Sequence, residues 1–254
     1  MSFAVIIGIC FIILIVLLLL YVLPMFSMHP LESGKIEGTD IIAMKNRINN
    51  LFFIPVENES GDCLGDASHF QSSGDCRGDW IVIDAGSDAK SVKLEMEKMA
   101  IDGRKVKAVF LTHTDYDHVA SITLFPNAVI YMSEQEKQMI DGSTNRQFIK
   151  KNSLPKLSGS NKITYLPDNE VIDFYQHKIR IFQAPGHTKG SAMYALDEKY
   201  LFTGDAFKIA NGHITVHPYT MDRKAAQETI HGVKGELKKY EKVFTAHYGL
   251  VEMT

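Results

Sequence analysis

The stretch THTDYDH occupies residues 112–118 and directly follows the apolar run VKAVFL at residues 106–111. The run has the character of a buried strand, so the polar stretch is predicted to form a loop at its carboxyl end, where open α/β sheets place their ligands. Its metal-binding side chains are His113, Asp115, Asp117 and His118. Imidazole and carboxylate together suit zinc, iron or manganese. A solvated polar loop is the alternative, but it rarely holds two histidines and two aspartates so closely.

Three more candidate ligands repeat this placement later in the chain. His187, Asp205 and His247 each come directly after an apolar segment that is predicted to be a strand. These strands are predicted at residues 178–184, 199–203 and 242–245. A single histidine or aspartate after a strand is usually structural, but the whole set in this order indicates one metal centre at the end of a sheet.

This set of residues resembles the signature of the metallo-β-lactamase superfamily. That signature is an Asp after an early strand, the motif H-x-H-x-D-H, and then a His, an Asp and a His after later strands. Asp84 stands at the early position, where the resemblance implies that it braces the site; a turn cap is the alternative. The resemblance runs from about residue 45 to the end. It implies an α/β fold, an αββα four-layer sandwich with a dinuclear metal site at one edge.

The second histidine of the family motif is replaced by Asp115. The resemblance implies that one ion is held by His113, Asp115 and His187, the other by Asp117, His118 and His247, and that Asp205 bridges them. It thus implies two divalent metal ions. Zinc is the first candidate, and the carboxylate of Asp115 makes iron or manganese the alternatives. Because aspartate is shorter than the glutamate of the similar flavodiiron branch, the alternatives for Asp115 are binding through water or a mononuclear site.

The resemblance implies a hydrolase in which a metal-bound hydroxide attacks a thioester, a lactone or a similar activated acyl bond of a small molecule. Asp117 is the candidate catalytic residue, because it would orient the nucleophile and take its proton. The motifs GHTKGS and FTGD are similar to hydroxyacylglutathione hydrolases, but only seven residues follow His247, which argues against glutathione as the substrate. The alternatives are a non-heme iron oxidoreductase, sulfur-dioxygenase-like or flavodiiron-like, and a non-catalytic metal-binding membrane protein.

The N-terminal segment has a different character from the rest of the chain. Residues 3–23 contain 20 apolar residues and Gly8, and no charge. As a helix they would span about 31 Å, close to the thickness of a bilayer core, and no small-x-small cleavage site follows. We therefore expect a single transmembrane anchor at residues 1–24, a juxtamembrane linker at 25–44 and the catalytic domain at 45–254.

The side of the membrane is left open by the sequence. Lys35 weakly favours a cytoplasmic domain by the positive-inside rule. A disulfide between Cys63 and Cys76 would favour the opposite side. The net charge of −3 and the absence of a basic aromatic stripe argue against nucleic acid as a partner, and the oligomeric state is open.

Other parts of the sequence yield more modest expectations. Residues 57–79, which include His69, are predicted to be a long loop that can form a flap over the metals. Ser133 and Glu136 are predicted to form a capping box at a helix start. A later helix is expected to begin at Thr220 or Asp222 and to run to about Lys239. Surface or packing roles are expected for the remaining histidines, at positions 29, 69, 177, 213, 217 and 231.

Overall fold

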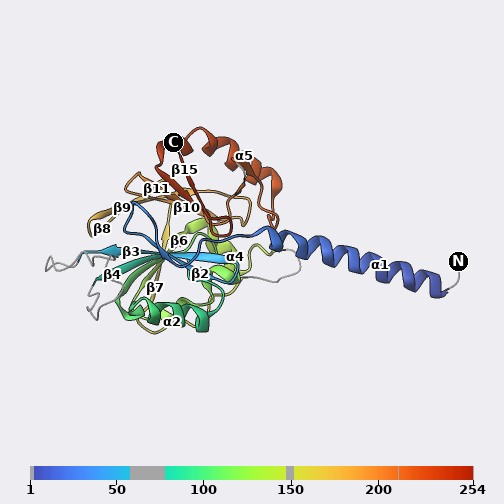
Figure 1. Ribbon diagram of the computed structural model, residues 1–254, viewed down its shortest axis with the longest axis horizontal. Helices are drawn as coiled ribbons and strands as arrows, with labels where there is room; N and C mark the ends of the chain where they lie inside the picture. Colours follow the sequence, from blue (N-terminus) through green and yellow to red (C-terminus); the bar gives the residue numbers. More distant parts are fainter. Residues whose placement is uncertain (1–2, 58–77, 147–151, 211, 254) are drawn as a thin grey trace.

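The fold consists of two facing β-sheets with helices on their outer sides, and one long helix projects from this body (Figure 1). The computed structural model describes residues 3–57, 78–146, 152–210 and 212–253. The layer order is helix, sheet, sheet, helix, which confirms the αββα sandwich expected from the sequence. Cys63, Cys76 and His69 lie outside the described residues, as does most of the predicted flap.

The first sheet has seven strands in the order of the chain. They are β1 (Gly34–Lys35), β2 (Ile42–Asn46), β3 (Asn49–Val56), β4 (Asp79–Ile83), β5 (Val106–Phe110), β6 (Val129–Ser133) and β7 (Lys162–Leu166). From β4 to β7 neighbouring strands are parallel, so their carboxyl ends meet at one edge. Residues 25–44, expected as a linker, supply β1 and the beginning of β2 to this sheet.

The second sheet has six strands. In spatial order they are β15 (Leu250–Glu252), β14 (Lys242–Phe244), β11 (Tyr200–Phe202), β10 (Ala192–Leu196), β9 (His177–Gln183) and β8 (Val171–Phe174). A separate hairpin consists of β12 (Lys208–Ala210) and β13 (His213–Thr215). Since β11 and β14 are parallel, the loops that follow them also leave the sheet at the same edge.

The helices cover the outer faces of the two sheets. The α-helices of the body are α2 (Ala89–Lys98), α3 (Tyr116–Val119), α4 (Lys137–Asp141) and α5 (Arg223–Lys234). Short 3-10 turns lie at Leu23–Ser27 (η1), Gly103–Lys105 (η2), Ile122–Leu124 (η3), Glu134–Glu136 (η4) and Leu237–Lys239 (η5). Of the two candidate caps, Asp222 begins α5 by accepting a hydrogen bond from the backbone of Ala225. The helix ends at Lys234, before the predicted end at Lys239.

Three apolar layers hold these elements together. The layer between the sheets is rich in aromatic side chains, among them Phe52, Phe110, Tyr194, Phe202 and Phe244. Phe202 and Phe244 stack with their ring centroids 4.9 Å apart, so the two strands that lead to Asp205 and His247 are packed side by side. This packing sets the positions of the two loops before either reaches the candidate site.

The predicted capping box at Ser133 is only half correct. The hydroxyl of Ser133 accepts a hydrogen bond from the backbone of Gln135, as a helix cap does. Glu136 instead turns inward and is completely buried. Its carboxylate accepts hydrogen bonds from the backbone and hydroxyl of Thr114 and from the hydroxyl of Thr188. The carboxylate of Glu136 therefore bonds to two loops at the sheet edge, where a capping box would have it bond to the backbone amide of Ser133.

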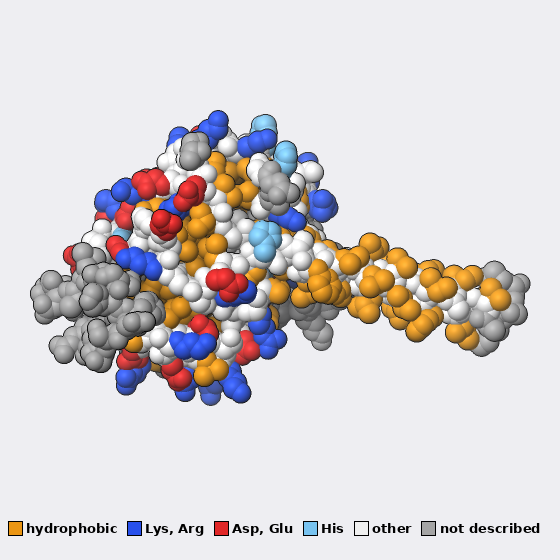
Figure 2. Space-filling model, in the orientation of Figure 1, with side chains coloured by type: hydrophobic (Ala, Val, Ile, Leu, Met, Phe, Trp, Pro, Cys, Tyr) orange, Lys and Arg blue, Asp and Glu red, His pale blue; other side chains and the backbone are white. Residues whose placement is uncertain are grey.

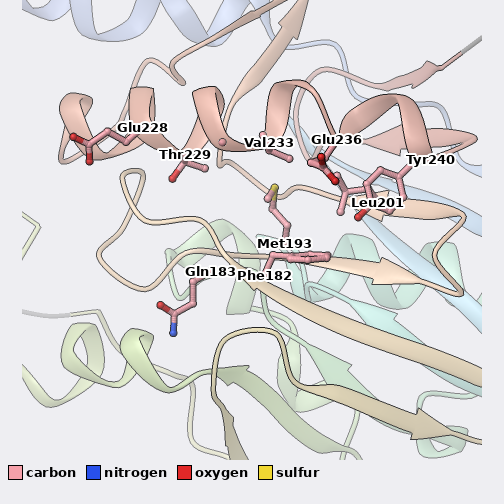
Figure 3. A pocket seen from close by; sticks show the side chains of 10 residues that line it. Phe182, Gln183, Met193, Leu201, Glu228, Thr229, Val233, Glu236 and Tyr240 are labelled. Carbon is pink, nitrogen blue, oxygen red and sulfur yellow. The ribbon is translucent and has the colours of Figure 1, made fainter.

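A cavity of about 260 Å³ lies between α5 and the outer face of the second sheet (Figure 3). Apolar side chains line its floor, including Phe182, Met193 and Leu201. Glu228 and Glu236 lie at its helix side. Its lining includes none of the candidate metal ligands.

The projecting helix is α1 (Phe3–Val22), and its apolar side chains are exposed along most of its length (Figure 2). Among the described residues it is the one helix long and apolar enough to cross a membrane, a property that signal sequences share. Its end contacts the body: the hydroxyl of Tyr219 donates to the carbonyl of Tyr21 at 2.6 Å. A few residues later the backbone of His29 donates to the carbonyl of His247 at 2.8 Å.

Candidate metal centre

The THTDYDH stretch lies, as expected, at the carboxyl end of a buried parallel strand. β5 ends at Phe110, and His113 follows three residues later with no exposed surface. The short helix α3 begins at Tyr116, and its first turn presents Asp117 and His118. Because the polypeptide changes direction here, imidazoles and carboxylates only a few residues apart face one another.

Asp84 holds this loop from the neighbouring strand β4. Its backbone has a positive φ of 58°, a conformation that aspartate tolerates better than most residues. The carboxylate accepts hydrogen bonds from the backbone of Thr112 at 2.8 Å and from its hydroxyl at 2.9 Å. It also pairs with Nδ1 of His118 at 2.8 Å, which directs Nε2 of that ring toward the centre. This carboxylate–histidine contact is typical of metal sites.

The loops after β9, β11 and β14 bring His187, Asp205 and His247 to the same place. Two glycines allow the close approach. A Cβ on Gly190 would lie 2.0 Å from the backbone nitrogen of Glu136, and one on Gly204 would lie 2.3 Å from the hydroxyl of Thr112. These positions explain why the residues GHTKGS and TGD surround the ligands: larger residues would push the loops apart.

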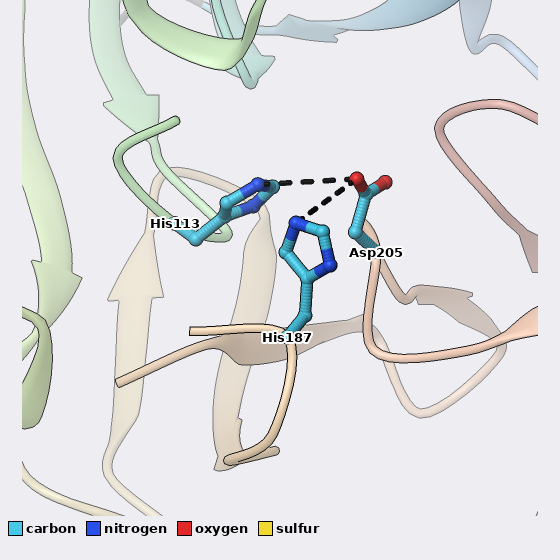
Figure 4. A group of neighbouring side chains, drawn as sticks. All are labelled: His113, His187 and Asp205. Carbon is cyan, nitrogen blue, oxygen red and sulfur yellow. Dashed lines mark ion pairs between the residues drawn. The ribbon is translucent and has the colours of Figure 1, made fainter. Parts of the chain in front are cut away.

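Asp205 lies at the middle of the cluster. Its Oδ2 atom is 3.2 Å from Nε2 of His247 and 3.3 Å from Nε2 of His187. The corresponding nitrogens of His118 and His113 lie at 3.7 and 4.0 Å. Figure 4 shows His113 and His187 directed toward this carboxylate. Asp117 completes the other side, since its Oδ2 is 3.4 Å from Nε2 of His247.

The donor atoms fit divalent metal ions. Within the described residues, Nε2 of His113, Nε2 of His118 and Oδ1 of Asp205 are buried and have no hydrogen-bond partner, which is costly unless another group satisfies them. Three triads each have their ligand atoms within 4.8 Å of one another. They are His113–His187–Asp205, Asp117–His118–His247 and Asp205–His217–His247.

Neighbouring charges and burial shift the pKa values of these groups in opposite directions. Burial lowers the pKa of His118, but the charges of Asp84, Asp117 and Asp205 outweigh this and raise it well above its usual value. Burial raises the pKa of Asp205, but the surrounding imidazoles hold it well below the usual range. Asp205 is therefore a carboxylate at neutral pH, available as a ligand.

His217 is a member of the cluster that the sequence did not reveal. It was expected to have a surface or packing role, but it is 1% exposed and its Nε2 lies 3.7 Å from Oδ2 of Asp205. Its ring lies 4.8 Å from that of His187 and 5.5 Å from that of His247. It follows strand β13, just as the other ligands follow strands, but this strand has the sequence HIT, and a single apolar residue does not mark a strand.

Asp115 lies beside His187 and His113, with which the sequence analysis grouped it, and has two further partners that the sequence did not reveal, Arg146 and Asn152. Its Oδ2 atom lies 3.1 Å from Nε2 of His187 and 3.6 Å from that of His113, within the cluster. The same oxygen forms an ion pair with Arg146 at 2.6 Å. Its Oδ1 atom accepts a hydrogen bond from Asn152 at 3.0 Å.

The flanking residues singled out in the motifs lie at the rim or in the supporting structure. Thr188 bonds to Ser191 and to Glu136, and Lys189 pairs with Asp222 at the surface. Tyr116 is 75% exposed, whereas burial raises the pKa of Tyr248 to about 12.

Comparison with known families gives the same assignment as the geometry. The model of the metallo-β-lactamase superfamily matches residues 76–247, more than half of the chain. The chain belongs to the metallo-β-lactamase superfamily. As a member of this superfamily with hydrolase relatives, it is an enzyme.

Curated members of the superfamily share about a quarter of the aligned residues with this chain. A probable metallo-hydrolase of Methanocaldococcus jannaschii is 25% identical over 175 residues, which cover 67% of this chain and 72% of the relative. A hydroxyacylglutathione hydrolase of Glaesserella parasuis is 28% identical over 145 residues, 55% of this chain and 50% of the relative. The alignment thus spans only half of that second enzyme.

A solved structure shows the same fold. The archaeal metallo-β-lactamase superfamily protein of Sulfolobus tokodaii superimposes with a TM-score of 0.54 at 20% identity. The match covers 89% of this chain and 81% of the other. At this identity the similarity supports the superfamily fold and leaves the substrate to be argued from the site.

Proposed function

We propose that this superfamily member is a membrane-anchored, metal-dependent hydrolase that cleaves a thioester, a lactone or a similar activated acyl bond of a small molecule. The observation that supports this most strongly is the buried carboxylate of Asp205, which lies among four imidazoles; within the described residues, Nε2 of His113 and Nε2 of His118 have no hydrogen-bond partner. The similarity of the GHTKGS and FTGD motifs to hydroxyacylglutathione hydrolases favours the thioester class. We do not propose the substrate of hydroxyacylglutathione hydrolase for this chain, because the alignment covers only half of that enzyme's length.

We assign six residues as metal ligands. They are His113, Asp117, His118, His187, Asp205 and His247. The prediction that Asp115 is a seventh ligand, and that two ions bind, stays a prediction. With histidine predominant among the donors, zinc is the metal we propose first. Bound there, such an ion supplies a Lewis acid for a substrate carbonyl and lowers the pKa of water.

Asp117 has the geometry of a catalytic carboxylate. Its side chain is 29% exposed, compared with 15% for Asp115 and 4% for Asp205. It is therefore the carboxylate of the cluster that substrate and water can reach most easily. We propose that Asp117 orients the attacking water and accepts its proton, while the buried Asp205 keeps its place between the imidazoles.

The function is tested by loading the full-length chain, purified in detergent, with Zn²⁺ and measuring hydrolysis of a panel of thioesters and lactones. Turnover of at least one class is expected. His118→Ala should reduce this rate about 100-fold or more, because the variant removes a metal ligand. His231→Ala is the matched control, since this histidine is exposed on α5, and it should retain the full rate. Full turnover by His118→Ala, or none by the zinc-loaded parent, would contradict the proposal.

A further inference from the structure

The side chain of Arg146 reaches the first metal position predicted from the family pattern. That position should be bounded by His113, Asp115 and His187. The Nη2 atom of Arg146 lies 2.6 Å from Oδ2 of Asp115 and 3.0 Å from Nε2 of His187. One guanidinium nitrogen therefore contacts two of the three atoms that would coordinate an ion.

Arg146 is held firmly in this position. Its Nη1 atom donates to the carbonyl of Tyr219 at 2.7 Å, and Nη2 also contacts the carbonyl of His187 at 3.2 Å. The side chain is 17% exposed, so the ion pair with Asp115 is largely removed from water. A buried arginine paired with a carboxylate is always charged, and it repels a cation at the same place.

The second metal position has one donor more than the family pattern predicts. The triads Asp117–His118–His247 and Asp205–His217–His247 share His247, and Oδ2 of Asp205 lies 3.7 Å from Nε2 of both His118 and His217, so the two triads adjoin. In the part of the chain that the structure describes, neither nitrogen of the buried His217 has a hydrogen-bond partner. A neutral imidazole left in this state is costly to bury, whereas a metal ion would satisfy it.

We propose that the guanidinium of Arg146 takes the place of the first metal ion, and that the chain binds one ion at the second position with His217 as an additional ligand. This inference rests on the proposed function, because it concerns the metal content of the same centre. Asp115 then serves as the counter-ion of Arg146 and is not a ligand. The argument for iron, which depended on the carboxylate of Asp115, then loses its basis. The donors of the single ion are Asp117, His118, Asp205, His217 and His247, and His113 and His187 are no longer among the ligands.

The number of ions tests the role of Arg146. The full-length chain in detergent is titrated with Co²⁺, followed by visible absorption, and its zinc content is measured by elemental analysis after loading and desalting. The unaltered chain should saturate at one equivalent, and Arg146→Ala at two. Arg146→Lys keeps a cation in place and should remain at one. Arg180→Ala is the control, since this arginine pairs with Glu198 at the surface, and it should also bind one ion.

The outcomes separate this inference from the proposed function. Two ions in the unaltered chain, or one in a folded Arg146→Ala variant, would overturn the substitution of metal by arginine while leaving a metallo-hydrolase intact. No bound metal at all would overturn both. Circular dichroism identifies variants that fail to fold, and Asp115→Asn then gives a second test, since it should still bind one ion.

The role of His217 is tested by affinity. Competition with a chromophoric chelator should show that His217→Ala binds Zn²⁺ roughly 10–100-fold more weakly than the unaltered chain. The Co²⁺ spectrum of this variant should change because one nitrogen donor is lost. His213→Ala, a nearby exposed histidine, is the matched control and should change neither property. Unchanged affinity and spectrum in His217→Ala would show that this residue is not a ligand.

Discussion

At the scale of single residues, the centre depends on side chains that orient its ligands. Nδ1 of His118 contacts Asp84, Nδ1 of His113 contacts the hydroxyl of Thr112, and Nδ1 of His247 contacts the carbonyl of Ile48 at 2.6 Å. In all three rings the Nε2 atom is thereby directed toward the cluster. A metal ion that enters finds these imidazoles already in place, so little conformational entropy is lost on binding.

Replacing Asp84 should weaken metal binding without removing a ligand. Asp84→Asn keeps the size of the side chain but loses the charge that holds His118 and Thr112. We expect zinc affinity to fall roughly 10–100-fold, as measured by chelator competition. Asp40→Asn, which removes a surface ion pair with Lys35, should leave the affinity unchanged. Equal affinities for the two variants would show that Asp84 does not support the centre.

Zinc affinity should rise with pH above neutrality. The carboxylates of Asp84, Asp117 and Asp205 raise the pKa of His118 well above 6.5, so the metal-free chain keeps a proton there that zinc must displace. The proton competes less with zinc for His118 as pH rises through this elevated pKa. The enthalpy of zinc binding, measured by calorimetry in buffers of different ionisation heat, should report proton release at pH 7 that declines at higher pH. Binding without proton release would contradict this charge assignment.

At the scale of elements, parallel strands deliver the ligands to one edge, and much of this was predictable. The segments before His113, His187, Asp205 and His247 are recognisable as strands because each contains adjacent apolar residues. β13 contains a single apolar residue, Ile214, so the sequence marks neither the strand nor His217 after it. Arg146 lies in an irregular segment far from the motif in sequence. Its pairing with Asp115 follows from tertiary packing alone.

Glu136 joins two of these ligand-bearing loops from a buried position between them. Its carboxylate accepts three hydrogen bonds from Thr114 and Thr188, while burial raises its pKa and offsets part of that gain. Glu136→Ala should lower the free energy of unfolding by about 3 kcal/mol, because buried donors lose their acceptor. Glu136→Gln, which keeps an acceptor, should cost less.

Urea denaturation of the zinc-free chain would measure this difference. Glu134 is the natural control, since it is exposed two residues earlier in the same turn, and Glu134→Ala should change the free energy of unfolding by less than about 0.5 kcal/mol. A loss at Glu136 no larger than at Glu134 would show that the loops hold together without this carboxylate.

At the scale of the whole molecule, the body and the projecting helix differ in the burial of their apolar side chains. The body buries its apolar side chains in three layers, whereas α1 leaves them exposed over about 30 Å of helix. Such a surface is unfavourable in water by roughly 25 cal/mol for each Å² of apolar area. The sequence indicated this contrast clearly, because a run of 21 uncharged residues has no polar face.

If α1 is the proposed anchor, the full-length chain should remain with membranes after alkaline extraction, because a lipid core favours the apolar surface of this helix. Sequencing of the extracted protein should find its original N-terminal residues. A chain that begins at Met28 is the control and should be recovered in the soluble fraction. Removal of the helix by cleavage in cells would identify it as a signal sequence and contradict the anchor.

Two contacts join the end of α1 and the segment after it to the part of the body that carries the candidate metal centre. Tyr21 touches Tyr219, and His29 is bonded to the backbone of His247, so only a short, attached piece of chain separates the helix from a ligand loop. If α1 lies in a bilayer, the centre is held close to the lipid headgroups. Substrates that themselves partition into the lipid surface would then reach it by diffusion in two dimensions, at a local concentration far above that in the surrounding solution.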